Sequence, residues 1–361
     1  MTSWTRRALA CALTLILVLA PAALAEAAKR KKPVDVTVMT RNIYLGGNIF
    51  HPIGSADLAE FERKAGELWA EVQGTDFVGT RARLLAREVK RTRPDLIGLQ
   101  EVALWRRGPD GVKDGAATPA TQVVYNFLKT FRRQLRRLSL RYAVGVTQQE
   151  ANIEAPIDAG YDVRLTMFDV VLVKKRRDLR VTDRLSENYE TTIGVPTPAG
   201  TLTSTRGYAA VDVRFKGKRF RFVNTHLEAA GDDIREAQAR ELVARGGPLR
   251  GKRQLIVVGD FNSDPQDVES DSGAFDILND FGLVDTWPRP RFGPGFSCCL
   301  NQSDARDPND DGFDHRIDLI LAKPKLRAIR GQVVGDELDD RAANGLWPSD
   351  HAGVVTRLRL R

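Results

Sequence analysis

Hydrophobic residues alternate with polar ones in some segments of the chain and recur at helical spacing in others. Short apolar runs, several with strict alternation, are typical of β-strands. Such runs cover 34–40, 95–99, 169–173, 208–215, 219–224, 255–258, 317–322 and 353–360. Helical spacing predicts helices over 56–72, 80–91, 121–140 and 232–246, with a short one near 274–281. Because strands and helices are mixed along the whole chain, we expect an α/β fold.

The first 25 residues form a separate segment. Arg6 and Arg7 precede an apolar run over 8–20, and Ala25 closes a small-x-small pattern typical of a signal-peptidase site. That run is short for a membrane-spanning helix. We therefore predict a signal peptide over 1–25, cleavage near Ala25, and a secreted or periplasmic protein. No linker composition divides the rest, so we expect a basic tail over 26–33 and one domain over 34–361, with long loops over 106–120 and 265–312.

Charge and cysteine content change this picture only slightly. The chain of 361 residues carries a formal net charge of +8 at pH 7, which suits a polyanionic substrate without specifying one. A predicted helical face carries Arg132, Arg133, Arg136 and Arg137. We interpret it as a solvated face, with a docking surface for nucleic acid or anionic lipid as the alternative.

Two further patterns resemble binding motifs but are incomplete. Cys298 and Cys299 are adjacent, so a disulfide between them would be strained, and no second Cys/His pair at zinc spacing accompanies them. The segment 307–312 matches the start of a calcium loop, D-x-[DN]-x-[DN]-G, but Asp318 stands where that loop would end in Glu. A polar turn is the favoured interpretation, and a structural calcium site is the alternative.

Polar side chains follow several predicted strands at the points where those strands end. The set comprises Asn42, Glu101, Asn224, His226, Asp260, Asn262, Asp318, Asp350 and His351. The chain lacks a P-loop, an HExxH motif and a GxSxG elbow. Oxygen donors without a cysteine cluster favour Mg²⁺, with Mn²⁺ or Ca²⁺ as alternatives, over zinc. Carboxylates around such a cation, with histidines and amides beside it, suit the hydrolysis of phosphate esters.

These motifs resemble a known family. TRN at Asn42, LIGLQEV at Glu101, VNTHLE at His226, GDFNSDP at Asp260, and then RIDLIL and SDH occur in the order of the endonuclease/exonuclease/phosphatase superfamily. That family includes pancreatic-type deoxyribonucleases, abasic-site endonucleases, bacterial sphingomyelinases and inositol-polyphosphate 5-phosphatases. The resemblance implies a four-layer sandwich, in which two mixed β-sheets pack face to face with helices on the outside.

The resemblance also implies roles for the acidic and amide residues. Glu101 would be the principal metal ligand, and Asn42 and Asp350 would complete or support that site. Asp260 would orient or deprotonate the attacking water. Asn262 would hold the phosphate or the geometry on the metal side.

The remaining implied roles concern the phosphate. His351, held in one tautomer by Asp318, would stabilise the phosphorane or donate to an oxygen. His226 would bind the phosphate and could protonate the leaving group. Asn224 would support His226, and Arg206 would be a structural or phosphate-facing residue.

The expected activity is metal-dependent hydrolysis of phosphodiesters by a monomer. Nucleic acid is the favoured substrate because of the net positive charge and the arginine-rich helix. A sphingomyelinase-like or phospholipase C-like lipid phosphodiesterase is the first alternative, and a phosphomonoesterase the second. A binding protein without catalysis is the least favoured reading. No transmembrane segment is expected, whereas peripheral contact with lipid stays open.

Overall fold

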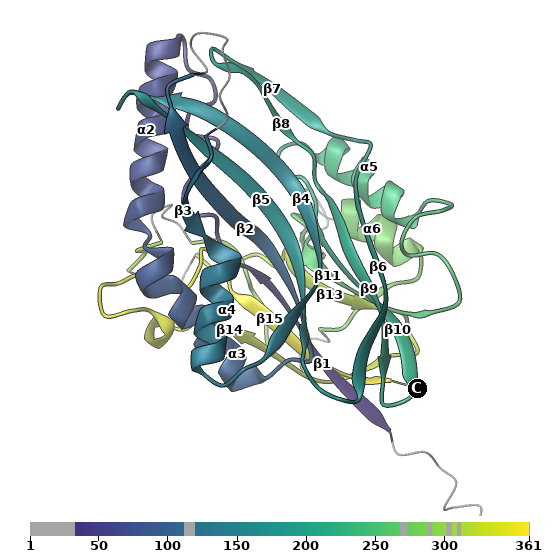
Figure 1. The fold of residues 1–361 in the computed structure, drawn as a ribbon. Coiled ribbons are helices and arrows are strands. Elements are labelled where there is room, and N and C mark those ends of the chain that lie inside the picture. The colour runs from purple at the N-terminus through teal and green to yellow at the C-terminus, as the bar shows by residue number, and fades with distance from the viewer. Residues whose placement is uncertain are drawn as a thin grey trace, which may run out of the picture. The chain divides into compact units, whose positions relative to one another are not determined.

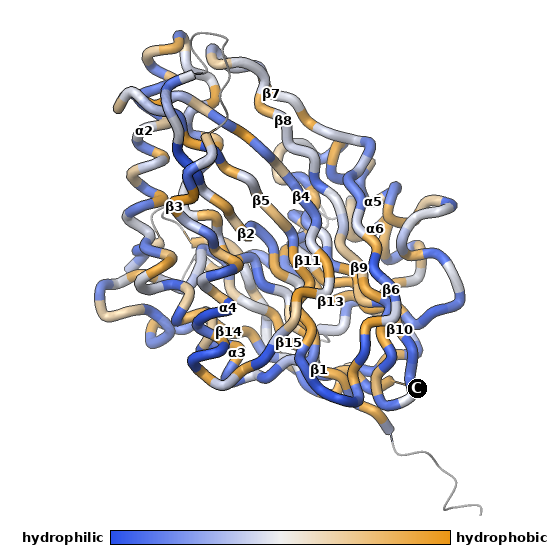
Figure 2. Tube along the Cα trace, in the orientation of Figure 1, coloured by the Kyte–Doolittle hydropathy of each residue, from blue (hydrophilic) through white to orange (hydrophobic). Residues whose placement is uncertain are grey.

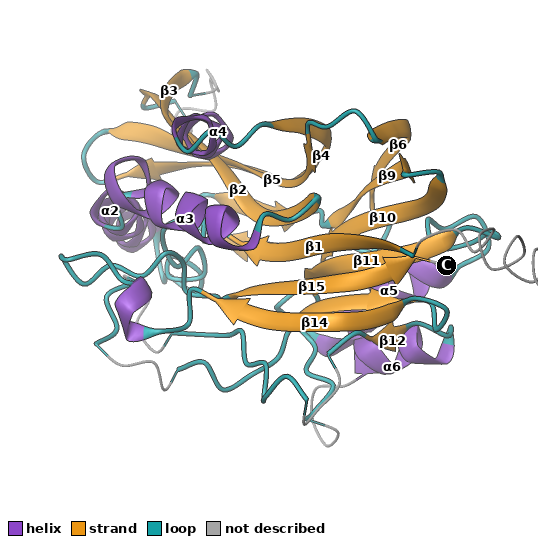
Figure 3. Cartoon of the chain, turned by 90° about the horizontal axis from the view of Figure 1, so that it is seen from below, coloured by secondary structure: helices purple, strands orange, loops and turns teal. Residues whose placement is uncertain are grey.

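Two β-sheets lie face to face, and helices cover their outer sides (Figures 1 and 3). This computed structural model describes residues 33–111, 120–267, 273–287, 291–300, 305–308 and 312–360. The predicted signal peptide, most of the basic tail and part of the 307–312 motif lie outside them. No helix in the described ranges is long and apolar enough to cross a membrane. The predicted α/β sandwich of two mixed sheets is confirmed.

The larger sheet, sheet A, has the strand order β14-β15-β1-β2-β5-β4-β8-β7, with β3 paired to β2. Its strands are β1 (Val34–Asn42), β2 (Leu96–Pro109), β3 (Gln122–Asn126), β4 (Tyr142–Ile157), β5 (Tyr161–Lys174), β7 (Ile193–Thr197), β8 (Gly200–Ser204), β14 (Arg327–Val334) and β15 (Gly353–Leu360). β1 and β2 are parallel, and the pair β2 and β5 is antiparallel. Sheet A is therefore mixed.

The second sheet, sheet B, has the order β12-β13-β11-β10-β9-β6. Its strands are β6 (Leu179–Asn188), β9 (Gly207–Phe215), β10 (Lys218–His226), β11 (Gln254–Asp260), β12 (Val284–Asp285) and β13 (Asp318–Ala322). β10 and β11 are parallel, and their neighbours are antiparallel. Figure 2 shows that the strands where the two sheets meet are largely hydrophobic, as expected of strands buried on both faces.

Helices form the two outer layers. They are α2 (Leu58–Gly74), α3 (Ala82–Thr92), α4 (Phe127–Arg137), α5 (Asp232–Val243) and α6 (Gly273–Asp280), with a π-helical turn at Phe77–Arg81 and a 3₁₀ turn at Leu338–Asp340. The apolar faces of α2, α3 and α4 belong to the core over sheet A. Those of α5 and α6 pack on sheet B through Leu242 and Leu278. Each helix thus buries the stripe that its hydrophobic spacing predicts.

A glycine allows the two sheets to meet at the end where the polar residues gather. A Cβ at Gly98 of β2 would lie 2.3 Å from Oδ1 of Asn224 in sheet B. Any larger residue would therefore push the sheets apart at this point. Gly98 is followed directly by Leu99, Gln100 and Glu101, so the close approach fixes where the end of this β2 segment lies relative to β10.

Two of the differences from the sequence predictions lie along the far half of β2. The helix predicted over 121–140 begins only at Phe127, because Gln122–Asn126 pairs with the far half of β2 as a strand. The loop predicted over 106–120 was wrong at its start, because β2 continues to Pro109 against β5. Both differences come from pairing with residues distant in sequence, which local patterns do not report.

Candidate active site

The polar strand ends gather around one pocket, which we call the rim pocket. It has a volume of about 340 Å³. β10 and β11 end side by side, with His226 opposite Asp260 in the parallel register. His351 lies just before β15 begins. Of the predicted site residues, the rim pocket is lined by Glu101, Arg206, His226, Asp260, Asn262, Asp350 and His351.

An irregularity in β2 turns Glu101 toward the rim pocket. The register of β2 against β5 shifts between Leu99 and Val102, and Glu101 itself has a left-handed backbone with φ 57°. Such bulges re-aim side chains next to functional sites. The Glu101 carboxylate accepts a hydrogen bond from the backbone N–H of Leu45 over 2.8 Å. Its orientation is therefore fixed by the fold.

Three residues that line the rim pocket have a backbone conformation that non-glycine residues rarely adopt. The φ angles are 56° at Tyr44, 57° at Glu101 and 46° at Asn262. Positive φ is unfavourable for residues with a Cβ, and such positions cluster at functional sites. Their concentration around one pocket supports its assignment as the functional site.

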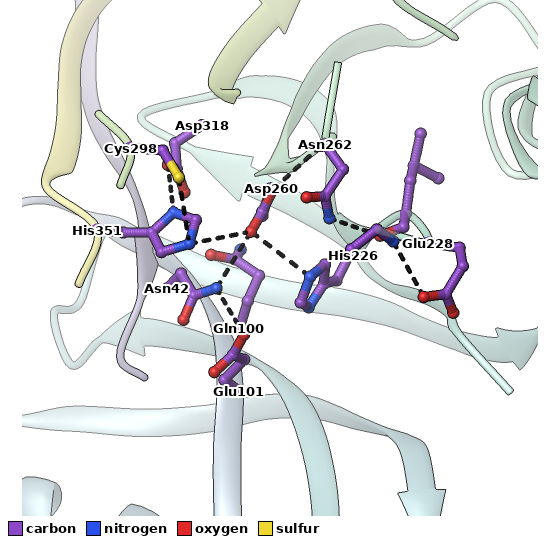
Figure 4. A network of polar contacts seen from close by, with 12 residues as sticks. Asn42, Gln100, Glu101, His226, Glu228, Asp260, Asn262, Cys298, Asp318 and His351 are labelled. Atoms are coloured by element: carbon purple, nitrogen blue, oxygen red, sulfur yellow. Dashed lines mark hydrogen bonds and ion pairs between the residues drawn. The ribbon is translucent and has the colours of Figure 1, made fainter. Parts of the chain in front are cut away.

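Asn42 joins two of the carboxylates (Figure 4). Its side-chain Nδ2 donates to Glu101 Oε1 over 3.0 Å and to Asp260 Oδ2 over 3.1 Å. Its Oδ1 accepts from the backbone N–H of Tyr44 over 2.9 Å. Asn42 is fully buried and does not line the rim pocket. The geometry gives it a positioning role, and its metal ligation stays a prediction.

Asp260 lies at the centre of the polar network. Burial raises its pKa to about 7, with a further rise from Asp318, against a lowering by His351 and by the hydrogen bond from Asn42. Its Oδ1 accepts from the backbone N–H of Asn262 over 3.0 Å. A carboxyl group whose pKa lies near neutrality can exchange a proton with water at physiological pH.

His351 and Asp318 form a buried pair. Nδ1 of His351 lies 2.8 Å from Asp318 Oδ2, and Nε2 lies 3.7 Å from Asp260 Oδ2. Burial lowers the pKa of His351, but Asp318 and Asp260 outweigh it, so the pKa stands well above the usual value. Asp318 does not line the rim pocket. The predicted His351–Asp318 contact is therefore present, with the ring in its charged form.

His226 has the opposite charge state. Burial lowers its pKa well below the usual value, and repulsion by Arg206 and His351 adds to the shift. Nη1 of Arg206 lies 2.8 Å from Nδ1 of His226, and Arg206 also pairs with Glu228 over 3.3 Å. Because a guanidinium can only donate, Nδ1 accepts and the single proton of the ring is on Nε2.

Nε2 of His226 lies 3.5 Å from Asp260 Oδ2, so the N–H faces into the rim pocket. A neutral ring in this tautomer can donate a hydrogen bond to a phosphate oxygen. It is poorly suited to the proton transfer to a leaving group that the sequence left open, because that transfer would leave an imidazolate. Arg206 thus lies behind the ring as its positioning residue.

Asn224 is not at the rim pocket. Its Nδ2 donates to Leu99 O over 3.0 Å and to Asp169 Oδ2 over 3.4 Å, and its Oδ1 accepts from Gln100 Nε2 over 2.5 Å. The side chain is fully buried between the sheets. These side-chain hydrogen bonds link the two sheets, so the expected place of Asn224 beside His226 in the phosphate site is corrected to a position between the sheets.

Sequence reasoning missed Arg41, which is fully buried beside the site. Its guanidinium makes two bonds of 2.9 Å to Glu88 and donates to the backbone oxygens of Asn42 and His351. It therefore ties the end of β1 to the segment before β15. Its place beside Asn42 in TRN was the available signal, but a strand-interior arginine is usually exposed.

The donors at one side of the rim pocket suit a hard divalent cation. Glu101 and Asp350 both line it, and both are oxygen donors. Burial raises the pKa of Asp350 to about 6, and repulsion from Glu101 contributes to this rise against the attraction of His351. A cation between such crowded acids relieves that repulsion. Ligand atoms of Asp260, Asp318 and His351 also lie within 4.8 Å of one another, although hydrogen bonding pairs Asp318 with His351.

Of the two incomplete motifs, the adjacent cysteines lie beside His351, and the calcium-loop pattern is described only in part. Cys298 and Cys299 form a disulfide, and Cys298 Sγ is 3.8 Å from His351 Nε2. The backbone oxygen of Asp307 accepts from the indole of Trp347 over 2.7 Å. The other two candidate ligand positions of the calcium-loop pattern, Asn309 and Asp311, lie outside the described residues.

Comparisons with known proteins agree with this geometry. A search of the curated proteins gives no significant match. An endonuclease/exonuclease/phosphatase family protein from Bacteroides thetaiotaomicron has 18% identity over 92% of this chain and 100% of its own, with a TM-score of 0.57. TDP2 from D. rerio, solved with a single-strand DNA product, has 14% identity over 90% and 99%, with a TM-score of 0.54.

A third solved structure is the mannosyl-6-phosphatase of Bacteroides thetaiotaomicron VPI-5482. It has 20% identity over 90% of this chain and 99% of its own, with a TM-score of 0.52. At such identities these three structures show a shared fold. The family model, in contrast, matches residues 69–351, which is most of the chain. The chain therefore belongs to the endonuclease/exonuclease/phosphatase family and is a hydrolase of phosphoester bonds.

Proposed function

We propose that the rim pocket hydrolyses phosphodiesters with the help of a divalent cation, for which Mg²⁺ is the favoured ion. The observation that carries this proposal is the position of Asp260 between two histidines in one pocket, with its Oδ2 3.5 Å from Nε2 of His226 and 3.7 Å from Nε2 of His351. This arrangement supplies a base and two kinds of hydrogen-bond donor within one pocket.

Asp260 takes a proton from the attacking water as the new P–O bond forms. His351, charged and held by Asp318, donates from Nε2 to a phosphoryl oxygen as negative charge develops there. His226, neutral, donates a second hydrogen bond from Nε2. The bond to the alcohol then breaks, and the alcohol oxygen receives a proton from His351 or from solvent. Asn262 lines the same pocket and is held by its Nδ2 donating to Leu227 O over 2.9 Å.

Glu101 and Asp350 are the residues that would hold the cation, with Asn42 keeping Glu101 in place. A bound divalent cation supplies polarisation of the phosphoryl oxygens and neutralises their charge. Mn²⁺ and Ca²⁺ prefer the same oxygen donors and are the alternatives to test.

Nucleic acid as the substrate stays a prediction. It is supported by the net charge of +8 and by the shared fold with TDP2 from D. rerio, which was solved with a DNA product. The arginine-rich helix α4 gives it little support, because Arg132 and Arg136 line a different cavity with Arg141 and Lys175. That cavity lies near the start of β2, where Tyr142 Oη donates to Pro94 O, and the five steps along the strand from Leu96 to Glu101 span about 16 Å.

The test is a comparison of substrates with the full chain. Plasmid DNA, RNA, sphingomyelin, a chromogenic phosphodiester and a phosphomonoester are each incubated with Mg²⁺, with and without EDTA. We expect chelator-sensitive hydrolysis of at least one diester, lost in Asp260→Asn and kept in Glu67→Gln, a change on the exposed side of α2. Hydrolysis of the monoester alone, or of no substrate, would overturn the proposal. Export of the protein is a separate prediction, tested by the mature N-terminus after expression in a secreting host.

A further inference from the structure

A second cavity, of about 90 Å³, adjoins the rim pocket. We call it the apolar cavity. Four residues line both spaces, namely Ile49, Phe50, Met167 and Arg206. A ligand whose phosphate lies in the rim pocket therefore has the apolar cavity directly beside it.

The floor of the apolar cavity is one face of sheet A. Alternate residues of β4 point to it, including Ala151 and Ala155, and alternate residues of β5 do so as well, including Leu165 and Met167. α2 lies over the floor through Phe61 and Leu68 among others. The two alanines are short where neighbouring positions carry large side chains, and this leaves space between sheet and helix.

The apolar cavity has an apolar interior and a charged edge. Its walls are almost entirely apolar, and its charged members, Arg206 and Glu228, stand where it approaches His226. These two side chains bond each other, and Ser204 Oγ donates to Glu228 Oε2 over 2.7 Å. The interior thus offers apolar contacts, while the side next to the rim pocket is charged.

The mouth of the apolar cavity is formed by the segment before α2. Phe50 is 45% exposed, an unusual position for a large apolar side chain, and it borders both the cavity and the rim pocket. Ile49 beside it is half-buried and borders both as well. Apolar groups exposed beside a cavity favour entry of an apolar ligand.

We propose that the apolar cavity binds an alkyl substituent of the substrate, so that the substrate class is an amphiphilic phosphodiester. This inference rests on the proposed phosphodiesterase activity and deepens it. Apolar cavities stay dry and take apolar ligands, and a cavity of about 150 Å³ admits benzene. The present one is smaller and admits the first carbons of a chain. A nucleobase would leave its polar edges without partners there.

The test separates binding from turnover. Affinities of n-alkyl phosphates from methyl to octyl are measured by calorimetry in the presence of Mg²⁺, using the full chain. We expect the affinity to rise by up to about fourfold for each methylene that enters, from the transfer free energy of a methylene group, and then to level off. Turnover of a chromogenic phosphodiester by the same preparation reports on the proposed function independently.

The variant Ala155→Leu fills the apolar cavity without touching the proposed catalytic residues. We expect it to bind methyl phosphate as the unsubstituted protein does and to lose the dependence on chain length. Ala59→Leu, a change of equal size at an exposed site on α2, should keep that dependence. Leu202→Trp on β8 serves as a second filling variant if Ala155→Leu fails to fold, which its thermal unfolding will show.

Two results would overturn the inference. The first is an affinity that does not vary with chain length in the unsubstituted protein. The second is an affinity that depends on chain length in Ala155→Leu and Leu202→Trp as strongly as it does in Ala59→Leu. The unsubstituted protein could instead fail to turn over the chromogenic phosphodiester while its affinity for alkyl phosphates still rises with chain length. That result would count against the proposed function and leave the binding site established.

Discussion

The guanidinium of Arg206 lies 2.8 Å from Nδ1 of His226, and this contact decides which nitrogen of the ring carries the proton. Because Arg206 donates, the N–H of the ring faces Asp260 and the rim pocket. Arg206 is itself held by a buried ion pair with Glu228. This pair therefore fixes which ring nitrogen of His226 can donate a hydrogen bond into the rim pocket.

The first prediction concerns the tautomer of His226. Nitrogen NMR should show His226 neutral from pH 5 to 8, with Nδ1 unprotonated, because burial and Arg206 lower its pKa. The signal is assigned by its disappearance in His226→Asn. In Arg206→Met combined with Glu228→Gln, the pKa should rise because the nearby positive charge is gone. A charged His226 ring at pH 7 in the unsubstituted protein would contradict this assignment.

The second prediction concerns Arg41. We expect it to contribute to stability through Glu88 and to activity through the backbone oxygen of His351, so that one contribution can be restored without the other. Arg41→Met leaves Glu88 buried without its partner and should lower the free energy of unfolding by about 3–5 kcal/mol. Arg63→Met, which breaks an exposed pair with Glu67 on α2, should cost about 0–1 kcal/mol. Urea unfolding measures both.

Arg41→Met combined with Glu88→Leu should recover much of that stability, because no buried charge is left unpaired. Its activity should stay low, because no guanidinium then holds the backbone oxygen of His351. Full recovery of activity along with stability would show that Arg41 acts on folding alone.

The third prediction concerns pH. Burial raises the pKa of Glu150 from 4.5 to about 8, against the attraction of Arg206. Between these two values the unfolded chain releases a proton that the folded chain keeps. The free energy of unfolding therefore falls by about 1.4 kcal/mol for each unit by which the pH rises within that window. Glu150→Gln cannot ionise, so its stability should fall less steeply from pH 5 to 8.

The measurement is the free energy of unfolding at several pH values for both proteins. Asp169, whose pKa burial and Glu150 also raise, should leave some slope in the variant. Parallel curves for the two proteins would show that Glu150 ionises normally in the fold.

The fourth prediction concerns the cation. Glu101→Gln replaces the carboxylate of a proposed metal ligand by an amide, which binds Mg²⁺ weakly. The Mg²⁺ concentration for half-maximal activity should rise by more than the roughly 10–100-fold that outer-shell partners are worth. Glu67→Gln should leave it unchanged. An unaltered Mg²⁺ requirement in Glu101→Gln would remove Glu101 from the metal site.

The sequence predicted β11 and β15 well, predicted β2 and β5 only in part, and did not predict β4. β11 and β15 lie where the hydrophobic patterns place them, because β11 has a continuous buried apolar run and the end of β15 alternates arginines with buried leucines. β4 was missed because two register shifts against β5 break its alternation and much of its length is half-buried. Gln122–Asn126 forms a strand only because the end of β2 is available to pair with it.

The residues of the candidate site were likewise predictable only in part. The residues that end strands, such as His226 and Asp260, were predictable because parallel strand ends meet at one edge of a sheet. Asn224 lies two positions before His226 on the same face of β10, so its side chain is deeper between the sheets and does not reach the rim. Arg41 and Glu88 come together across 47 positions, a contact that no local pattern announces.

The central claim is that Asp260 acts on a phosphodiester held in the rim pocket, and turnover of the unsubstituted protein against Asp260→Asn tests it most directly. With saturating Mg²⁺ and a chromogenic phosphodiester, kcat should fall by orders of magnitude in the variant, while the fold and the Mg²⁺ affinity persist. Removing a positioned general base alone costs about 10²–10⁴-fold. A variant that keeps most of its turnover would contradict the claim.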